Sequence, residues 1–101
     1  MRKSIGWKNI MSKIQNFIQN DIREHPEAKK EYEQVSLNLD ASVLIREMRE
    51  DLGMTQKEFA KYVGKPQSTI GRIEAGSMNV SIGLIDEIAN AAHRKVKLVL
   101  I

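Results

Sequence analysis

Cysteine is absent from the 101-residue sequence, and histidine, proline and aromatic residues are scarce. Without cysteine the chain forms no disulfide and offers no thiolate to a metal ion. Its two histidines, His25 and His93, belong to no metal-ligand spacing and to no set of nucleophile, base and orienting residue. We therefore expect no enzymatic activity, no metal site and no cofactor.

Long apolar runs are also missing. No stretch approaches the roughly 20 residues that a membrane-spanning helix needs, and the start of the chain lacks the apolar core of a signal peptide. A chain of 101 residues has room for one compact domain with a short extension, because a second hydrophobic core would need more apolar sequence. We expect a cytoplasmic protein.

Positive charge is concentrated rather than abundant. The net charge is only +3, yet within residues 55–73 Lys57, Lys61, Lys65 and Arg72 stand against Glu58 alone, so four minus one leaves +3 on this stretch. A basic patch on a helical surface suits contact with phosphate, although solvated helix faces also carry such an excess by chance.

The first half of the chain has helical periodicity. Apolar residues recur at steps of three and four from Trp7 to Ile22, which predicts an amphipathic helix that ends at His25-Pro26. Pro26 then suits the first turn of a second helix, which we expect to reach about Val35. Because residues 36–40 show no helical period, we place a boundary there, between a helical extension (residues 1–39) and a core domain (residues 40–94).

Four further helices are predicted in the core domain from their end signals. The first stops at Gly53, which tolerates the left-handed conformation that closes helices. Thr55 stands three residues before Glu58, a capping box that starts the next helix at Gln56. The predicted spans are a helix with its apolar face at Leu44, Ile45, Met48 and Leu52, then Gln56 to Val63, Pro66 to Glu74 and Ser81 to Ala92.

The last seven residues, 95–101, are rich in β-branched and apolar residues and partly alternate, which predicts a short strand. This strand has no partner within the chain, and a two-fold homodimer could satisfy both copies by antiparallel pairing. We expect dimerisation through Val96, Leu98 and Leu100.

The region from Gln56 to Ile73 has the spacing of a helix-turn-helix. Counting Gln56 as the first position, Ala60 is fifth, Gly64 ninth and Ile70 fifteenth. These positions call for a small residue at the closest approach, a turn glycine and a branched apolar residue facing the first helix. Through these residues and the segment Ser68–Gly76 the chain resembles the XRE, or lambda-repressor-like, family.

The resemblance implies an all-α lambda-repressor-like fold that binds double-stranded DNA, whereas a helical corner of this geometry can also serve packing alone. If the helix after Gly64 enters the major groove, its exposed N-terminal end reaches the bases. The expected base-reading residues are Gln67, Ser68, Gly71 and Arg72, and the expected phosphate contacts are Gln56, Lys61, Lys65, Thr69 and Ser77.

Two more positions match the family. An arginine of the first domain helix often pairs with the glutamate that ends the recognition helix, and Arg49 and Glu74 stand at these positions. Ala75, however, replaces the asparagine that commonly follows that glutamate and touches phosphate, so the resemblance gives no such contact here.

The N-terminal apolar face either covers the chain's own core or is a docking surface for a partner protein. Pro26-Glu27 and Glu31-Tyr32 ahead of the helix-turn-helix resemble HigA-type antitoxins, although His25 stands where aspartate is usual. That resemblance implies a RelE-like ribonuclease toxin as partner and repression of the shared operon at a palindromic operator. The expected toxin-binding residues are Trp7, Ile14, Phe17, Ile18, Ile22 and Tyr32.

Two alternatives stay open. The chain could be a stand-alone, phage-like repressor without a toxin, in which the N-terminal helix belongs to its own fold or dimer. It could also be a protein-interaction module that does not bind DNA.

Overall fold

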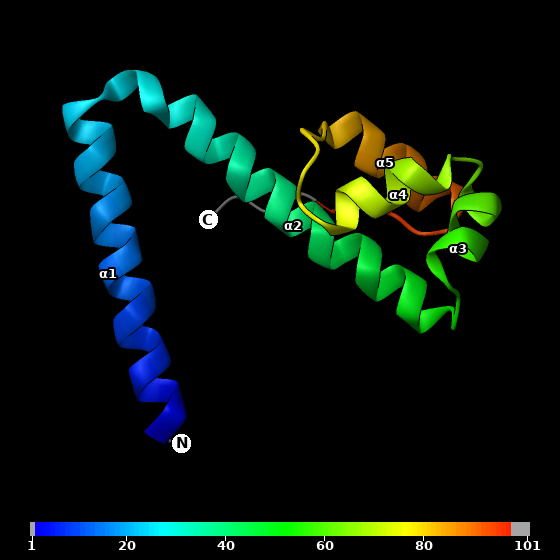
Figure 1. The fold of residues 1–101 in the computed structure, drawn as a ribbon, viewed down its shortest axis with the longest axis horizontal. Coiled ribbons are helices and arrows are strands. Elements are labelled where there is room, and N and C mark those ends of the chain that lie inside the picture. The colour runs from blue at the N-terminus through cyan, green and yellow to red at the C-terminus, as the bar shows by residue number, and fades with distance from the viewer. Residues whose placement is uncertain (1, 98–101) are drawn as a thin grey trace. The chain divides into compact units, whose positions relative to one another are not determined.

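The computed structural model describes residues 2–97, and it describes the side chains from Ile10 onward. Within these residues the chain is helical and contains no strand (Figure 1). The elements are α1 (Arg2–Glu24), the 3-10 helix η1 (Pro26–Ala28), α2 (Lys29–Asp51), α3 (Gln56–Val63), α4 (Gln67–Glu74) and α5 (Ile82–Ala91). The chain divides into two compact units between Glu33 and Gln34, inside α2.

The N-terminal unit consists of α1, η1 and the first turn of α2. α1 ends at Glu24, where the sequence predicted it to end, because Pro26 disfavours a helical conformation at His25. The hydroxyl of Tyr32 donates a hydrogen bond to Oδ2 of Asp21 and so joins α2 to α1. This bond is the largest of the influences that raise the pKa of Tyr32 above its ordinary value.

α2 is one continuous helix from Lys29 to Asp51, so the predicted break at residues 36–40 is wrong. Serine, asparagine and aspartate weaken the helical signal in this segment, but tertiary contacts override that weak preference. Asn38 is buried and Leu37 packs against the core of the C-terminal unit. The assignment of residues 1–39 and 40–94 to separate tasks stays a prediction.

The core of the C-terminal unit gathers apolar side chains from α2, α3, α4 and α5. Its largest fully buried side chains are Ile45, Phe59, Ile70, Ile73 and Ile88. Each fully buried aliphatic or aromatic side chain of this size contributes about 1.5–3 kcal/mol to folding. The inward positions predicted for the helix-turn-helix are therefore confirmed, and they hold α3 and α4 in one packed body with α2 and α5.

Local signals set the ends of these helices. Thr55 and Glu58 form the predicted capping box: the Glu58 amide donates to Thr55 Oγ1 at 3.1 Å, and the Thr55 amide donates to Glu58 Oε1 at 2.9 Å. The hydrogen bonds from the Thr55 backbone and side chain lower the pKa of Glu58. Pro66 is the N-cap of α4 rather than its first helical residue, a shift of one position.

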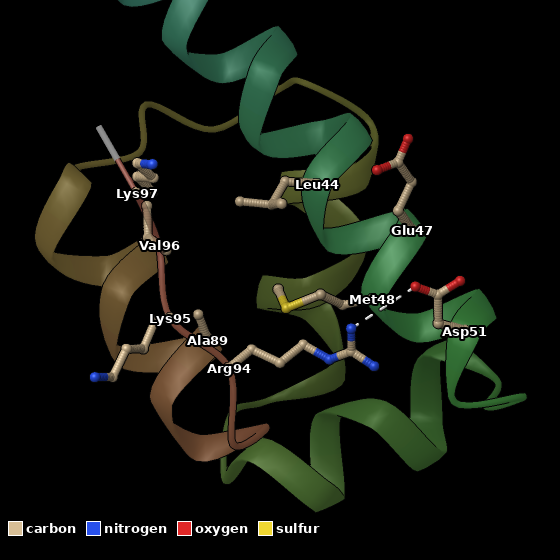
Figure 2. A pocket seen from close by; sticks show the side chains of 9 residues that line it. All are labelled: Leu44, Glu47, Met48, Asp51, Ala89, Arg94, Lys95, Val96 and Lys97. Atoms are coloured by element: carbon tan, nitrogen blue, oxygen red, sulfur yellow. Dashed lines mark ion pairs between the residues drawn. The ribbon is translucent and has the colours of Figure 1, made fainter. Parts of the chain in front are cut away.

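The described part of the predicted C-terminal strand, residues 95–97, is not in a strand. Val96 instead packs against the core of its own chain, and it lines a groove between α2 and α5 that carries both apolar and charged side chains. Figure 2 shows Val96 on the wall opposite Leu44 and Met48, with an ion pair of 3.8 Å between Arg94 and Asp51 across the groove. The other predicted dimerisation residues, Leu98 and Leu100, lie outside the described residues.

None of the helices among the described residues has the length and apolar character needed to cross a membrane.

Candidate nucleic-acid interface

α3 and α4 form a wedge around the turn at Gly64. Gly64 adopts a left-handed φ of +73°, a conformation that glycine reaches without the steric cost of a Cβ atom. The Lys65 amide donates to the Ala60 carbonyl at 2.9 Å, which closes α3 with a Schellman-type bond. Ala60 and Ile70 are buried where the two helices meet, so the orientation of α4 on α3 is fixed by packing.

Three of the four predicted base-reading residues present side chains to solvent. Gln67 and Ser68 are exposed in the first turn of α4, and Arg72 is exposed one turn later. Because residues four apart share a helix face, Ser68 and Arg72 lie on the same side of α4. The structure therefore exposes an amide and a hydroxyl in the first turn of α4 and a guanidinium in its last turn.

Gly71 is the fourth predicted base-reading residue, and it is half-buried. A Cβ atom at this position would lie 3.5 Å from Oε1 of Gln56, which is an ordinary van der Waals contact. Gly71 thus faces the start of α3 and adds no hydrogen-bonding side chain to the exposed surface of α4.

The predicted phosphate-contacting residues differ in how they are placed. Lys61 is exposed and Thr69 is half-buried. Ser77 is exposed, with its hydroxyl 3.4 Å from the Arg72 carbonyl. The ammonium of Lys65 lies 2.9 Å from the Glu87 carboxylate, with 23% of its side chain exposed. Gln56 is half-buried at the start of α3.

The end of α4 is fixed to α2 by a buried ion pair, as the family resemblance predicted. The guanidinium of Arg49 binds both carboxylate oxygens of Glu74, with Nε to Oε2 at 2.8 Å and Nη2 to Oε1 at 2.9 Å. Its third nitrogen, Nη1, donates to the Met54 carbonyl at 3.0 Å. Only 3% of the Glu74 side chain is exposed, so this bidentate pair is shielded from solvent.

Opposing influences act on the pKa of the Glu74 carboxyl group. Burial is the largest, and by itself it raises the pKa of the carboxyl group. Hydrogen bonds from Arg49 and Gln56, together with the charges of Arg49 and Arg46, outweigh burial and leave the pKa of Glu74 below its ordinary value. The same pair raises the pKa of Arg49, with the hydrogen bond to Glu74 as its largest cause. Both groups are therefore charged at neutral pH.

The last carbonyl of α4 is also held by α2. The Ser42 hydroxyl donates to the Glu74 carbonyl, and Arg46 Nη2 lies 3.4 Å from the same oxygen. A helix leaves its last carbonyls without partners inside the helix, and here α2 supplies partners for one of them. Side chains of α2 therefore bond to both the carboxylate and the backbone carbonyl of Glu74, and these bonds hold the end of α4 on α2.

A second polar network was not predicted from the sequence. Asn38 is buried, and its Oδ1 accepts hydrogen bonds from Gln34 Nε2 at 2.7 Å and from the Val80 amide at 3.0 Å. Its Nδ2 donates to Asn79 Oδ1 at 3.1 Å. These bonds hold the loop between α4 and α5 on α2. The only sequence signal was a lone asparagine between two leucines, of which Leu37 packs against the core and Leu39 is exposed.

The predicted toxin-binding residues lie in the N-terminal unit. Phe17 is 68% exposed and Ile14 is 46% exposed. Ile18, Ile22 and Tyr32 are partly buried within this unit, and the side chain of Trp7 lies outside the described ones. Two members of the predicted set are therefore strongly exposed apolar residues on α1.

Among the side chains that the structure describes, no three histidine, aspartate or glutamate residues converge to hold a metal ion.

Comparison with known proteins identifies the same region. Residues 45–95 match the helix-turn-helix family HTH_3. An uncharacterized HTH-type transcriptional regulator of Methanothermobacter thermautotrophicus is 44% identical over 52 residues, which are 52% of this chain and 75% of that protein. Two proteins of Archaeoglobus fulgidus with the same description are 42% and 40% identical over 53 residues, which cover 52% of this chain and 76% and 75% of theirs.

No solved structure matches the chain significantly. The family match nevertheless spans half of the chain, and it coincides with the wedge of α3 and α4 and the helices that support it. This chain belongs to the HTH_3 helix-turn-helix family of the XRE type, together with relatives described as HTH-type transcriptional regulators.

Proposed function

We propose that this chain is a sequence-specific repressor that places α4 in the major groove of its operator. The observation that carries this proposal is that Gln67, Ser68 and Arg72 are exposed on a helix whose C-terminal end is fixed by the buried Arg49–Glu74 pair. A recognition helix needs both features, since the reading side chains must be free and their support must be rigid.

The three exposed side chains suit different partners on DNA. The carboxamide of Gln67 can pair with both the acceptor and the donor of adenine, and the guanidinium of Arg72 with both acceptors of guanine, each pairing contributing about 1–3 kcal/mol of discrimination. Ser68 can donate to a base or to a phosphate. Lys61 and Lys65 would contact phosphates, with Gln56, Thr69 and Ser77 in the same role, and these contacts would add affinity without sequence preference.

Binding as a homodimer to a palindromic operator is part of this proposal. Two copies related by a two-fold axis would place two α4 helices in successive major grooves, about 34–36 Å apart or at a multiple of that spacing. The mass in solution, measured for the full chain and for a chain without residues 95–101, tests dimerisation and the role of the C-terminus. An unchanged dimer after truncation would remove residues 95–101 from the interface.

Selection of binding sites from a pool of random duplexes tests base reading. We expect the wild-type chain to enrich a two-fold symmetric sequence. Arg72→Ala should lose preference at one base pair of each half-site, because it removes a base-reading guanidinium and little else. Lys61→Ala is the matched control: it removes one exposed positive charge nearby and should weaken binding to all sequences by a similar factor. Equal loss at every sequence for Arg72→Ala would contradict its role.

A second function is favoured by the exposed face of α1. Ile10, Ile14 and Phe17 are 51%, 46% and 68% exposed, and they recur along α1 at steps of four and three, so they share one side of this helix. An apolar row of this kind is a typical docking surface for another protein. Together with the resemblance to HigA-type antitoxins, it supports neutralisation of a RelE-like toxin encoded beside this chain.

Co-purification with the product of the neighbouring gene tests the antitoxin role. We expect Phe17→Glu and Ile14→Glu to abolish co-purification without changing DNA binding, because both lie outside the helix-turn-helix. The matched control is Gln15→Glu, which adds the same charge at an exposed polar position of α1. Failure to co-purify with the wild-type chain, or absence of a toxin-like neighbour, would favour a stand-alone repressor.

A further inference from the structure

The turn between α3 and α4 carries a lysine that is already paired with an acidic residue. The Lys65 ammonium lies 2.9 Å from the Glu87 carboxylate of α5. Of the two side chains, that of Lys65 is 23% exposed and that of Glu87 is 62% exposed. The lysine stem is therefore largely covered, while the carboxylate that holds its charge faces solvent.

Lys65 lies directly before α4, the helix proposed to read DNA. Its backbone amide closes α3 by donating to the Ala60 carbonyl, and Pro66, the N-cap of α4, follows directly. Lys65 therefore stands beside the N-terminal end of α4, where exposed Gln67 and Ser68 begin the proposed reading surface. If α4 enters the major groove, the sugar-phosphate backbone that borders the groove comes within reach of a lysine at this place.

A phosphate brought to Lys65 meets Glu87 as well. Two like charges repel, and a carboxylate in contact with the ammonium would stand close to any phosphate on the other side of that ammonium. When DNA binds, either Lys65 moves away from Glu87, or the phosphate stays close to the Glu87 carboxylate and is repelled by it. Each course makes binding weaker than an unpaired Lys65 would allow.

We propose that Glu87 is an affinity-setting residue of the DNA-binding surface: it neutralises Lys65 in the unbound protein and lowers the affinity for every duplex alike. This inference rests on the proposed DNA binding. Because Glu87 is not expected to touch a base, it changes the affinity for DNA and leaves the base preference unchanged. Its effect is largest while Lys65 is present to hold a phosphate nearby.

The expected size of the effect follows from Coulomb's law. For two unit charges roughly 6 Å apart at a solvated surface, the repulsion corresponds to about a threefold to tenfold change in affinity. Glu87→Gln removes the charge and keeps the shape of the side chain. We expect this variant to bind duplex DNA about threefold to tenfold more tightly than the wild type, by the same Coulomb estimate. The dependence of affinity on salt should also become steeper, because one more protein charge is then free to neutralise phosphate.

Fluorescence anisotropy with a short labelled duplex of mixed sequence measures this directly, with the full chain at low and at moderate salt. Four proteins form a cycle: wild type, Glu87→Gln, Lys65→Gln and the double variant. We expect tighter binding for Glu87→Gln, weaker binding for Lys65→Gln, and a clearly smaller gain when Glu87→Gln is added to Lys65→Gln than when it is added to the wild type. Because 62% of the Glu87 side chain is exposed, we expect Glu87→Gln to leave the fold unchanged.

Asp86→Asn is the matched control. It raises the net charge by the same amount on the same helix, but the Asp86 carboxylate lies 3.3 Å from Nδ2 of Asn90 and is paired with no lysine in the described structure. We expect Asp86→Asn to change affinity much less than Glu87→Gln does. Equal tightening by the two variants would reduce the effect to net charge and overturn the proposal.

The other outcomes are equally decisive. Unchanged binding by Glu87→Gln would show that the Glu87 carboxylate has no effect on the affinity for DNA, and weaker binding would show that it holds Lys65 in place for a phosphate. Either result overturns the inference, while the proposed DNA binding stands. A gain from Glu87→Gln that is equally large with and without Lys65 would overturn it too. If the wild-type chain binds no duplex even at low salt, the proposed function and this inference fail together.

Discussion

Replacing Arg49 by methionine should destabilise the fold strongly, because it leaves a buried carboxylate without its main partner. Methionine retains much of the apolar bulk of the arginine stem, so the packing of the side chain at position 49 changes little. The two bonds to Glu74, at 2.8 and 2.9 Å, and the bond to the Met54 carbonyl are lost.

The magnitude follows from the burial of Glu74. Removing one partner of a buried ion pair costs about 3–5 kcal/mol, since the remaining charge stays in a poorly solvated place. Only 3% of the Glu74 side chain is exposed, which places the pair in this class. Arg46 Nε, 3.7 Å from Oε1, can compensate in part. We therefore expect a loss of about 3 kcal/mol, the lower end of that range.

The dependence of this loss on pH has a defined sign. In the wild type the pKa of Glu74 is lowered by folding, so its contribution to stability is present above the unfolded pKa and is lost as the pH falls through the folded pKa. Without Arg49, burial dominates and raises the pKa of Glu74, so the variant regains stability by protonating this group as the pH falls. The difference in unfolding free energy between the two proteins should shrink from neutral to acidic pH.

Urea unfolding followed by circular dichroism, at neutral pH and at several acidic values, measures both quantities. Arg46→Met is the matched control: the Arg46 side chain is 55% exposed and its Nε is farther from the Glu74 carboxylate, at 3.7 Å, so we expect a cost of no more than about 1 kcal/mol. If Arg49→Met costs about as much as the control, or if its cost grows as the pH falls, the loss of stability does not come from an unpaired Glu74 carboxylate.

Four further substitutions test other parts of the same unit by urea unfolding. Thr55→Ala removes the capping hydroxyl of α3 and should cost about 1 kcal/mol; a neutral result would mean that the capping box adds nothing to stability. Gly64→Ala places a Cβ at φ +73° and should cost about 1–2 kcal/mol, whereas Gly83→Ala, inside α5, should stabilise by about 0.5–1 kcal/mol; the same sign at both positions would contradict this account. Asn38→Ala leaves the Val80 amide without its partner and should cost about 1–3 kcal/mol, and a smaller loss would show that water replaces the carboxamide.

Local sequence signals were sufficient for much of the helix-turn-helix. The capping box at Thr55, the turn at Gly64 and the inward positions of Ala60 and Ile70 all depend on residues a few positions apart, and the structure confirms each of them. Signals of this range act within one or two helical turns, so they can be read without knowing where the rest of the chain lies. The family resemblance added the Arg49–Glu74 pair, which periodicity alone does not reveal.

Errors arose where the decisive partner lies far along the chain. Residues 36–40 show no helical period, yet α2 runs through them because Asn38 bonds to the loop before α5 and Leu37 packs on the core. Val96 looked like part of a dimer strand, whereas it packs within its own chain. In both cases a tertiary contact outweighed a weak local preference.

The sequence by itself determined where α3 and α4 begin and turn, and which of their residues face inward, because caps, a left-handed glycine and apolar spacing act over short distances. The tertiary structure decided which charges are neutralised: it paired Lys65 with Glu87 and buried Glu74 against α2. An ion pair depends on where two distant helices bring their side chains, and only the packed core determines that.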